Sequence, residues 1–205
     1  MSPKGLLSKL PAGSKVSAGF TRGSDIMRKP FRGVMVLSDV TGDDRCYYLV
    51  FTLIRSEEVI IDNQRIKNYE EGAALTLYMN FQSTNAKYNE GTLQNFVRNT
   101  GSLMGIHGDY EWQEAYGELE HFKNMIGNVY IAEAVTRNIK AEKDKYYLNF
   151  TLCSNSANQP STLYDNNVLD YLTVRNYAIS PELRNAVLAK LPVKAPADTS
   201  DDVAL

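Results

Sequence analysis

The alternation of apolar and polar residues predicts two β-hairpins with a further strand between them. Residues 33–53 and 127–152 each contain two stretches rich in β-branched and aromatic residues, joined by a polar turn, which is typical of a hairpin. The second stretches nearly repeat each other: residues 47–53 read Tyr-Tyr-Leu-Val-Phe-Thr-Leu and residues 146–152 read Tyr-Tyr-Leu-Asn-Phe-Thr-Leu. Residues 75–81 alternate cleanly and predict the strand between the hairpins.

Apolar residues at helical spacing predict a first helix between the hairpins. Thr92 is its expected N-cap, Leu93, Phe96 and Val97 lie on its apolar face, and Gly101 is expected to end it early. A second helix is predicted over residues 112–126, with an apolar face of Trp112, Tyr116, Leu119, Phe122 and Ile126 and with Gly127 just past its end.

The chain after the second hairpin predicts one more strand and a short helix. Residues 168–179 read as the strand, and Ser180-Pro181-Glu182 begins a helix that reaches about Leu191. The order of hairpin, strand, helices and hairpin predicts a mainly β protein, a five-stranded OB-like Greek-key barrel with peripheral helices. A β-sandwich with a helical insertion and a half-open antiparallel sheet are the alternatives.

Composition limits the class of protein. The 205 residues are 43% hydrophobic and 22% charged, with a net charge of 22 − 24 = −2, so the chain is neither disordered nor collagen-like. With only Cys46 and Cys153, it is no disulfide scaffold, and we expect both thiols to be reduced. No stretch is long and apolar enough for a membrane helix, and residues 1–10 do not read as a secretion signal. We therefore expect a cytoplasmic protein without a membrane contact.

The placement of charge predicts a domain with two extensions. Residues 1–33 contain seven basic residues and one aspartate, a local net charge of 7 − 1 = +6, and residues 1–30 are expected to form a flexible basic arm. Residues 192–205 combine prolines, small residues and three aspartates, which predicts a disordered acidic tail. Residues 31–191 are then the single OB-like domain.

The two sides of the predicted strands differ in a way that suggests a binding surface. One side of each is apolar and is expected to form the core, as in Tyr47, Leu49, Phe51 and Leu53. The other side has tyrosines among small or polar residues, a pattern that suits stacking of unpaired bases. We expect these tyrosines to be Tyr48, Tyr78, Tyr147 and, on the last strand, Tyr171 beside Arg175.

Basic residues near the strand ends could neutralise the phosphates of such a ligand. The turn of the second hairpin, residues 136–145, has a net charge of 4 − 2 = +2, and in an OB barrel this loop flanks the ligand groove. The expected phosphate contacts are Arg55, Arg137, Lys140, Lys143 and Lys145. High strand propensity of tyrosine and a solvated hairpin tip are the alternative explanations of the two patterns.

No motif in the sequence predicts catalysis. Phosphate-binding and dinucleotide-binding glycine loops and a nucleophile elbow are all missing. His107 and His121 are 14 residues apart, which fits no single-turn metal pair, and the carboxylates cluster as expected of solvated surfaces. We therefore predict a protein that is not an enzyme and needs no metal or cofactor.

The two hairpins, the strand and helix between them and the acidic C-terminus resemble phage-encoded single-stranded DNA-binding proteins of the OB fold. The resemblance implies sequence-tolerant binding of single strands in viral DNA replication or recombination, inside the host cytoplasm. It also implies that the tail recruits replication proteins and competes for the cationic groove. The tail departs from that family's pattern because it has three acids and ends in Leu205 where an aromatic residue is usual.

Three hypotheses for function follow. The first is a single-stranded DNA-binding protein, with the alternative of RNA and of a homo-oligomer left open. The second is a virion or assembly protein whose basic arm and tail clasp neighbouring subunits. The third is a nuclease that uses scattered carboxylates and a divalent metal.

Overall fold

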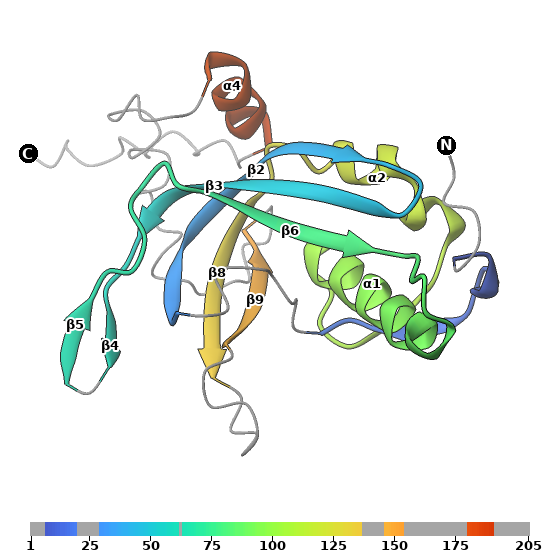
Figure 1. Ribbon diagram of the computed structural model, residues 1–205. Helices are drawn as coiled ribbons and strands as arrows, with labels where there is room; N and C mark the ends of the chain where they lie inside the picture. The colour runs from blue at the N-terminus through green and yellow to red at the C-terminus, as the bar shows by residue number, and fades with distance from the viewer. Residues whose placement is uncertain (1–6, 20–28, 62, 137–145, 154–179, 191–205) are drawn as a thin grey trace, which may run out of the picture.

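The computed structural model describes residues 7–19, 29–61, 63–136, 146–153 and 180–190. The predicted strand at 168–179 and the tail at 192–205 lie outside this described part. Its architecture is mainly β, with one five-stranded antiparallel sheet that curls into a half-barrel (Figure 1), two small two-stranded sheets and three α-helices.

The large sheet contains both predicted hairpins and the predicted middle strand. Its order is β6 (Ala74–Asn80), β3 (Cys46–Ser56), β2 (Phe31–Gly42), β8 (Val129–Thr136) and β9 (Tyr146–Leu152), and every neighbouring pair is antiparallel. The two long hairpins therefore meet through their first strands. Alternation in the sequence correctly predicted all five of these strands.

One side of the sheet forms the main core, as the alternation predicted. Tyr47, Leu49, Phe51 and Leu53 are at most 2% exposed, and Leu77, Met79 and Phe81 continue the same layer on and beyond β6. The rings of Phe51 and Phe150 stack at a centroid distance of 4.8 Å, which joins the repeated segments of the two hairpins. Each fully buried side chain of this size contributes about 1.5–3 kcal/mol.

Helix α1 (Asn89–Leu103) packs against β6 and β9, the two edge strands of the sheet. Its buried residues Phe96, Val97 and Leu103 belong to the main core. No ladder joins β6 directly to β9 in the part of the chain that the structure describes. The sheet is thus an open half-barrel with a helix between its edges.

The first helix begins earlier and ends later than the sequence predicted. Thr92 lies inside the helix, where its hydroxyl donates a hydrogen bond to the carbonyl oxygen of Tyr88 at 2.9 Å, so it is not the N-cap. Gly101 is buried in the last turn and does not end the helix. A Cβ at Gly101 would come within 2.6 Å of the Tyr110 ring, so close packing explains this glycine.

The prediction of one continuous helix over residues 112–126 is wrong. The structure has strand β7 (Asp109–Glu111), the 3-10 turn η4 (Glu114–Gly117) and helix α2 (Leu119–Lys123). Glu118 separates the last two with extended backbone angles, φ −85° and ψ 145°. The apolar side chains of the pattern still face the core, and Gly127 does follow in the left-handed region at φ +89°.

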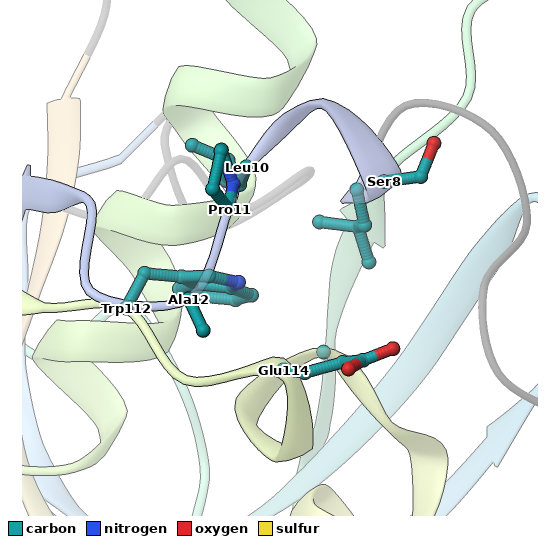
Figure 2. A pocket seen from close by; sticks show the side chains of 8 residues that line it. Ser8, Leu10, Pro11, Ala12, Trp112 and Glu114 are labelled. Atoms are coloured by element: carbon teal, nitrogen blue, oxygen red, sulfur yellow. The ribbon is translucent and has the colours of Figure 1, made fainter.

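Residues 7–19, which belong to the segment expected to form the basic arm, pack against the body. Leu7 in the 3-10 turn η1 (Leu7–Lys9) is only 8% exposed, and β1 (Lys15–Ser17) pairs with β7 in an antiparallel sheet. A cavity of about 260 Å³ remains beneath this segment (Figure 2), lined by Leu7, Ser8, Leu10, Pro11, Ala12, Trp112, Glu114 and Gly117.

A second two-stranded sheet projects from the body as a ribbon (Figure 1), which the sequence analysis did not predict. It consists of β4 (Val59–Ile61) and β5 (Gln64–Ile66) and is inserted between β3 and β6. Ile61 pairs with Gln64, and Asn63 between them is in the left-handed region at φ 63°. The Asp62-Asn63 pair after three β-branched residues was the available signal for this turn.

Helix α4 (Pro181–Lys190) confirms the predicted C-terminal helix and covers part of the opposite side of the sheet. Val187 is completely buried in a separate apolar cluster with Val34, Val36, Ile54, Val129, Ile131 and Cys153. The Lys190 ammonium donates hydrogen bonds to the carbonyl oxygens of Asn124 and Ile126. The outer side of the β2–β8 pair is therefore occupied by α4.

Candidate nucleic-acid interface

The outer side of β3 and β6 carries a pair of tyrosines that the sequence analysis had singled out. Tyr48 and Tyr78 lie directly opposite each other in the β3–β6 ladder. Their rings meet edge to face, with a centroid distance of 5.6 Å and an interplanar angle of 80°. Tyr78 is 45% exposed and Tyr48 is half-buried. The register thus brings two of the predicted residues into one aromatic platform.

The surroundings of this platform are polar or small. Thr76 and Asn80 precede and follow Tyr78 on the same side of β6, and Asn80 is exposed. Val50 continues the side from Tyr48 and lies opposite Asp39 of β2. A solvated strand face with an exposed ring among small residues can accept a flat apolar group such as an unpaired base.

The β2–β3 turn gives this end of the sheet an acidic character. The carboxylate of Asp43 accepts hydrogen bonds from the backbone N–H groups of Arg45 at 2.7 Å and Cys46 at 2.9 Å. These bonds to the charged form lower the pKa of Asp43 below its ordinary value. Asp43 is consequently ionised at neutral pH.

The hydroxyl of Tyr48 donates to the other oxygen of Asp43 at 3.5 Å. The charge of Asp43 raises the pKa of Tyr48 above its ordinary value. The hydroxyl end of the platform therefore faces a carboxylate and does not favour a phosphate. The exposed ring of Tyr78 is the part of the platform that suits a ligand.

Arg55 does not join the tyrosine platform. It lies seven residues beyond Tyr48 on β3, about 23 Å along an extended strand. Its guanidinium pairs with Glu57 at 3.3 Å, and Glu57 also pairs with Arg32, which contacts Glu133 at 2.9 Å. Two acids thus offset two bases in this network, so Arg55 is not an uncompensated cation.

Tyr147 lies on β9, three strands away from β3 in the sheet order, with its backbone opposite Val135. It is therefore not a neighbour of Tyr48 and Tyr78 within the sheet, and its side chain lies outside the description. The remaining predicted contacts also fall outside the described residues: Arg137, Lys140, Lys143, Lys145, Tyr171 and Arg175.

The turn residues Asp43 and Arg45 were missed as neighbours of the candidate site. The available signal was their position between the paired strands, since the first hairpin loop of an OB barrel borders the ligand face. The backbone hydrogen bonds to Asp43 could not be read from the composition of the loop.

The described residues contain no group of three or more His, Cys, Asp and Glu side chains that could hold a metal ion. Neither cysteine forms a disulfide, and both are buried. Burial raises the pKa of Cys46 to about 11 and that of Cys153 to about 12. Both side chains are therefore neutral thiols at physiological pH, and such thiols are weak nucleophiles.

Comparisons of the chain with protein-family models, curated proteins and solved structures find no match. Among the helices that the structure describes, none has the length and apolar character needed to cross a membrane.

Proposed function

We propose that this protein binds single-stranded DNA, without sequence preference and without catalysis, on the outer face of β3 and β6. Counted along the chain, the five strands of the sheet have the spatial order 3-2-1-4-5, with α1 between the third and fourth. That order and helix position support an OB-like fold, in which strands 2 and 3 face the oligonucleotide. Here those strands are β3 and β6.

The observation that carries the proposal is the Tyr48–Tyr78 pair on this face. Tyr78 offers an exposed ring for base stacking, and Tyr48 supports that ring edge to face. Every base has an aromatic face, so such stacking tolerates any sequence. Since Asp43 repels phosphate at the β2–β3 turn, the proposal assigns the phosphate contacts to Arg137, Lys140, Lys143 and Lys145 in the β8–β9 connection.

The test compares tyrosine variants in a titration of labelled oligo-dT, followed by fluorescence anisotropy at low salt. Tyr78→Ala should weaken binding by about fivefold to a hundredfold, because one base–aromatic stack is worth about 1–3 kcal/mol. Tyr78→Phe should keep most of the affinity, since the ring remains. Log affinity should also fall linearly with log salt, by about 0.7 for each phosphate neutralised.

Tyr88→Ala is the matched control, because Tyr88 is 59% exposed but lies before α1 and outside the sheet. It should bind like the wild type. Wild-type protein that fails to bind at micromolar concentration, or Tyr78→Ala that binds unchanged, would contradict the proposal.

A virion or assembly role is the second candidate, and the projecting β4–β5 ribbon favours it (Figure 1). A ribbon outside the core is a suitable element for contacting a neighbouring subunit. This role requires a defined higher oligomer in the absence of nucleic acid, measured by size-exclusion chromatography with light scattering. An oligomer of that kind with no affinity for oligo-dT would favour assembly over strand binding.

A further inference from the structure

The β2–β3 turn holds the Asp43 carboxylate in a fixed position beside the Tyr48–Tyr78 platform. One oxygen of Asp43 accepts hydrogen bonds from the backbone N–H groups of Arg45 at 2.7 Å and Cys46 at 2.9 Å. The backbone N–H of Asp43 donates in turn to the carbonyl oxygen of Cys46 at 3.0 Å. The turn therefore closes around this side chain, and Asp43 has less freedom than an ordinary surface aspartate.

The second oxygen of Asp43 faces the platform. It accepts a hydrogen bond from the hydroxyl of Tyr48 at 3.5 Å. The charge of Asp43 raises the pKa of Tyr48, so the proton of this bond stays on the tyrosine at neutral pH. The bond is long, but its acceptor is charged and the turn keeps that acceptor in place.

Tyr48 passes this constraint on to Tyr78. The two residues lie opposite each other in the β3–β6 ladder, and their rings meet edge to face at a centroid distance of 5.6 Å. Such a contact depends on the side-chain orientation of both rings. Tyr78 is 45% exposed, so the edge of Tyr48 restricts a ring that solvent would otherwise leave mobile.

A platform that is ordered before binding accepts a base at lower entropic cost. An exposed tyrosine loses side-chain freedom when a base stacks on it, and this loss weakens binding. Fixing the orientation of the ring in the free protein removes part of that cost. Asp43 consequently has two opposite effects on a nucleic acid, because its charge repels phosphate while its hydrogen bond orders the tyrosines.

We propose that Asp43 is a positioning residue of the platform: it anchors the Tyr48 hydroxyl and, through the Tyr48 ring, holds Tyr78 in the orientation that accepts a base. This inference rests on the proposed function. It assigns a supporting role to an acid that charge alone would count against nucleic-acid binding.

Asp44 provides the matched control for the charge of Asp43. It is the next acid of the same turn, and it is exposed. In the described part of the chain, the hydrogen bonds of this turn do not involve its side chain. Asp43→Ala and Asp44→Ala thus remove the same charge from the same turn, and a difference between their affinities reports the contacts of Asp43.

Titration of labelled oligo-dT at low salt, followed by fluorescence anisotropy, compares these variants. Asp44→Ala should bind at least as tightly as the wild type, and Asp43→Ala should bind about threefold to tenfold more weakly than Asp44→Ala. Equal affinities of the two alanine variants would overturn the proposal.

Asp43→Asn is the conservative variant that should restore binding. Its carboxamide oxygen can accept the two backbone N–H groups, and its NH₂ group can donate to the Tyr48 hydroxyl. It therefore removes the charge and keeps the anchor, so it should bind as tightly as Asp44→Ala. An affinity as low as that of Asp43→Ala would contradict the anchoring role.

Tyr48→Phe shows whether Asp43 acts through the tyrosine, because it removes the hydroxyl and keeps both the ring and the turn. In this background no anchor remains to be lost, so Asp43→Ala should have the same effect on affinity as Asp44→Ala. If Asp43→Ala weakens binding equally with and without the Tyr48 hydroxyl, it acts through the turn itself and the proposal is wrong.

NMR spectra of the full chain with labelled tyrosines test the anchor without nucleic acid. The ring resonances of Tyr78, assigned by their loss in Tyr78→Phe, should move in Asp43→Ala and in Tyr48→Phe. They should move far less in Asp44→Ala and in Asp43→Asn. Unmoved Tyr78 resonances in Asp43→Ala overturn the proposal even where the affinity changes.

The spectra also separate this proposal from the proposed function. A wild type that does not bind oligo-dT contradicts the function, while the Tyr78 resonances still decide the anchoring. Thermal melting shows whether each variant is folded. Should Asp43→Ala melt early, Tyr48→Phe alone decides, since it leaves the turn unchanged: wild-type affinity together with unmoved Tyr78 resonances would then overturn the proposal.

Discussion

At the scale of single residues, His121 combines ring contacts with an unpaired nitrogen. Its imidazole lies 5.2 Å from the Tyr116 ring and 5.5 Å from the Phe122 ring, measured between centroids. Its Nε2 is buried and has no hydrogen-bond partner in the described part of the chain. Burial lowers the pKa of His121, because the protonated ring would lose its hydration there. The fold therefore favours the neutral imidazole.

This preference makes folding stability depend on pH. The folded-state pKa lies below the ordinary value of 6.5, so below that pH the unfolded chain binds a proton that the folded chain does not. We expect the free energy of unfolding to fall as the pH drops from 6.5 toward the folded-state pKa. His121→Phe keeps the ring and removes the titration, so it should flatten this part of the profile.

Urea unfolding between about pH 7.5 and 5.5 measures the effect. His107→Phe is the control, because His107 is exposed and its replacement should leave the wild-type pH dependence. An equally steep loss of stability in His121→Phe would show that other groups cause it.

At the scale of elements, α4 is attached to the outer side of the sheet through Val187 and its apolar neighbours. Val187 is completely buried against the cluster around Val34 and Ile131. The backbone of Ala186 lies so close to Gly127 that a Cβ there would be 3.1 Å from it. This apolar cluster is separate from the main core, so we expect α4 to detach without opening the sheet.

Replacement of Val187 should release α4 selectively. In Val187→Asp a carboxylate would have to be buried without a partner, which costs several kcal/mol, so the helix is expected to undock. Hydrogen exchange should then show lost protection at residues 181–190 and unchanged protection in β3 and β6. Leu188→Asp, on the exposed side of the same helix, should keep α4 protected; global unfolding of Val187→Asp would contradict the separation of the two clusters.

The local pattern of apolar and polar residues predicted those elements in which buried and exposed side chains alternate along a short stretch of chain. The strands of both hairpins could be predicted because the core side and the outer side alternate residue by residue. The helix over 112–126 could not be judged from its pattern, because Trp112 exchanges backbone hydrogen bonds with Gly13 and Ser14, each at 2.8 Å. Those partners are about a hundred positions away in the sequence, and helical periodicity contains no information about them.

In the candidate site too, the sequence predicted single residues but not how they meet in space. Exposure on the outer strand face predicted Tyr48 and Tyr78 separately, but only the β3–β6 register makes them one platform. Arg55 seemed free because its partners are on other segments: Glu57 follows β3, and Arg32 on β2 shares that acid. Charge compensation across strands depends on register and bulges, which the order of residues alone does not reveal.

At the scale of the whole molecule, the N-terminal segment packs against residues that are far away in the sequence. β1 pairs with β7, and Gly13 and Ser14 bond to Trp112. Leu7 and Trp112 are both buried in the main core and line the same cavity, and Trp112 is only 1% exposed. A basic segment that composition alone would assign to a flexible arm thus contributes to the main core.

Deletion of residues 1–19 should therefore destabilise the whole body. Loss of the buried Leu7 side chain and renewed exposure of Trp112 should together lower the free energy of unfolding by about 3 kcal/mol or more. Urea denaturation followed by Trp112 fluorescence measures this loss, since Trp112 is the single tryptophan and reports its own exposure.

Deletion of residues 1–6 is the matched control, because it removes none of the contacts made by Leu7, Gly13, Ser14 or β1. It should leave the midpoint of unfolding unchanged. If both deletions have the same small effect, residues 7–19 rest on the surface without stabilising it.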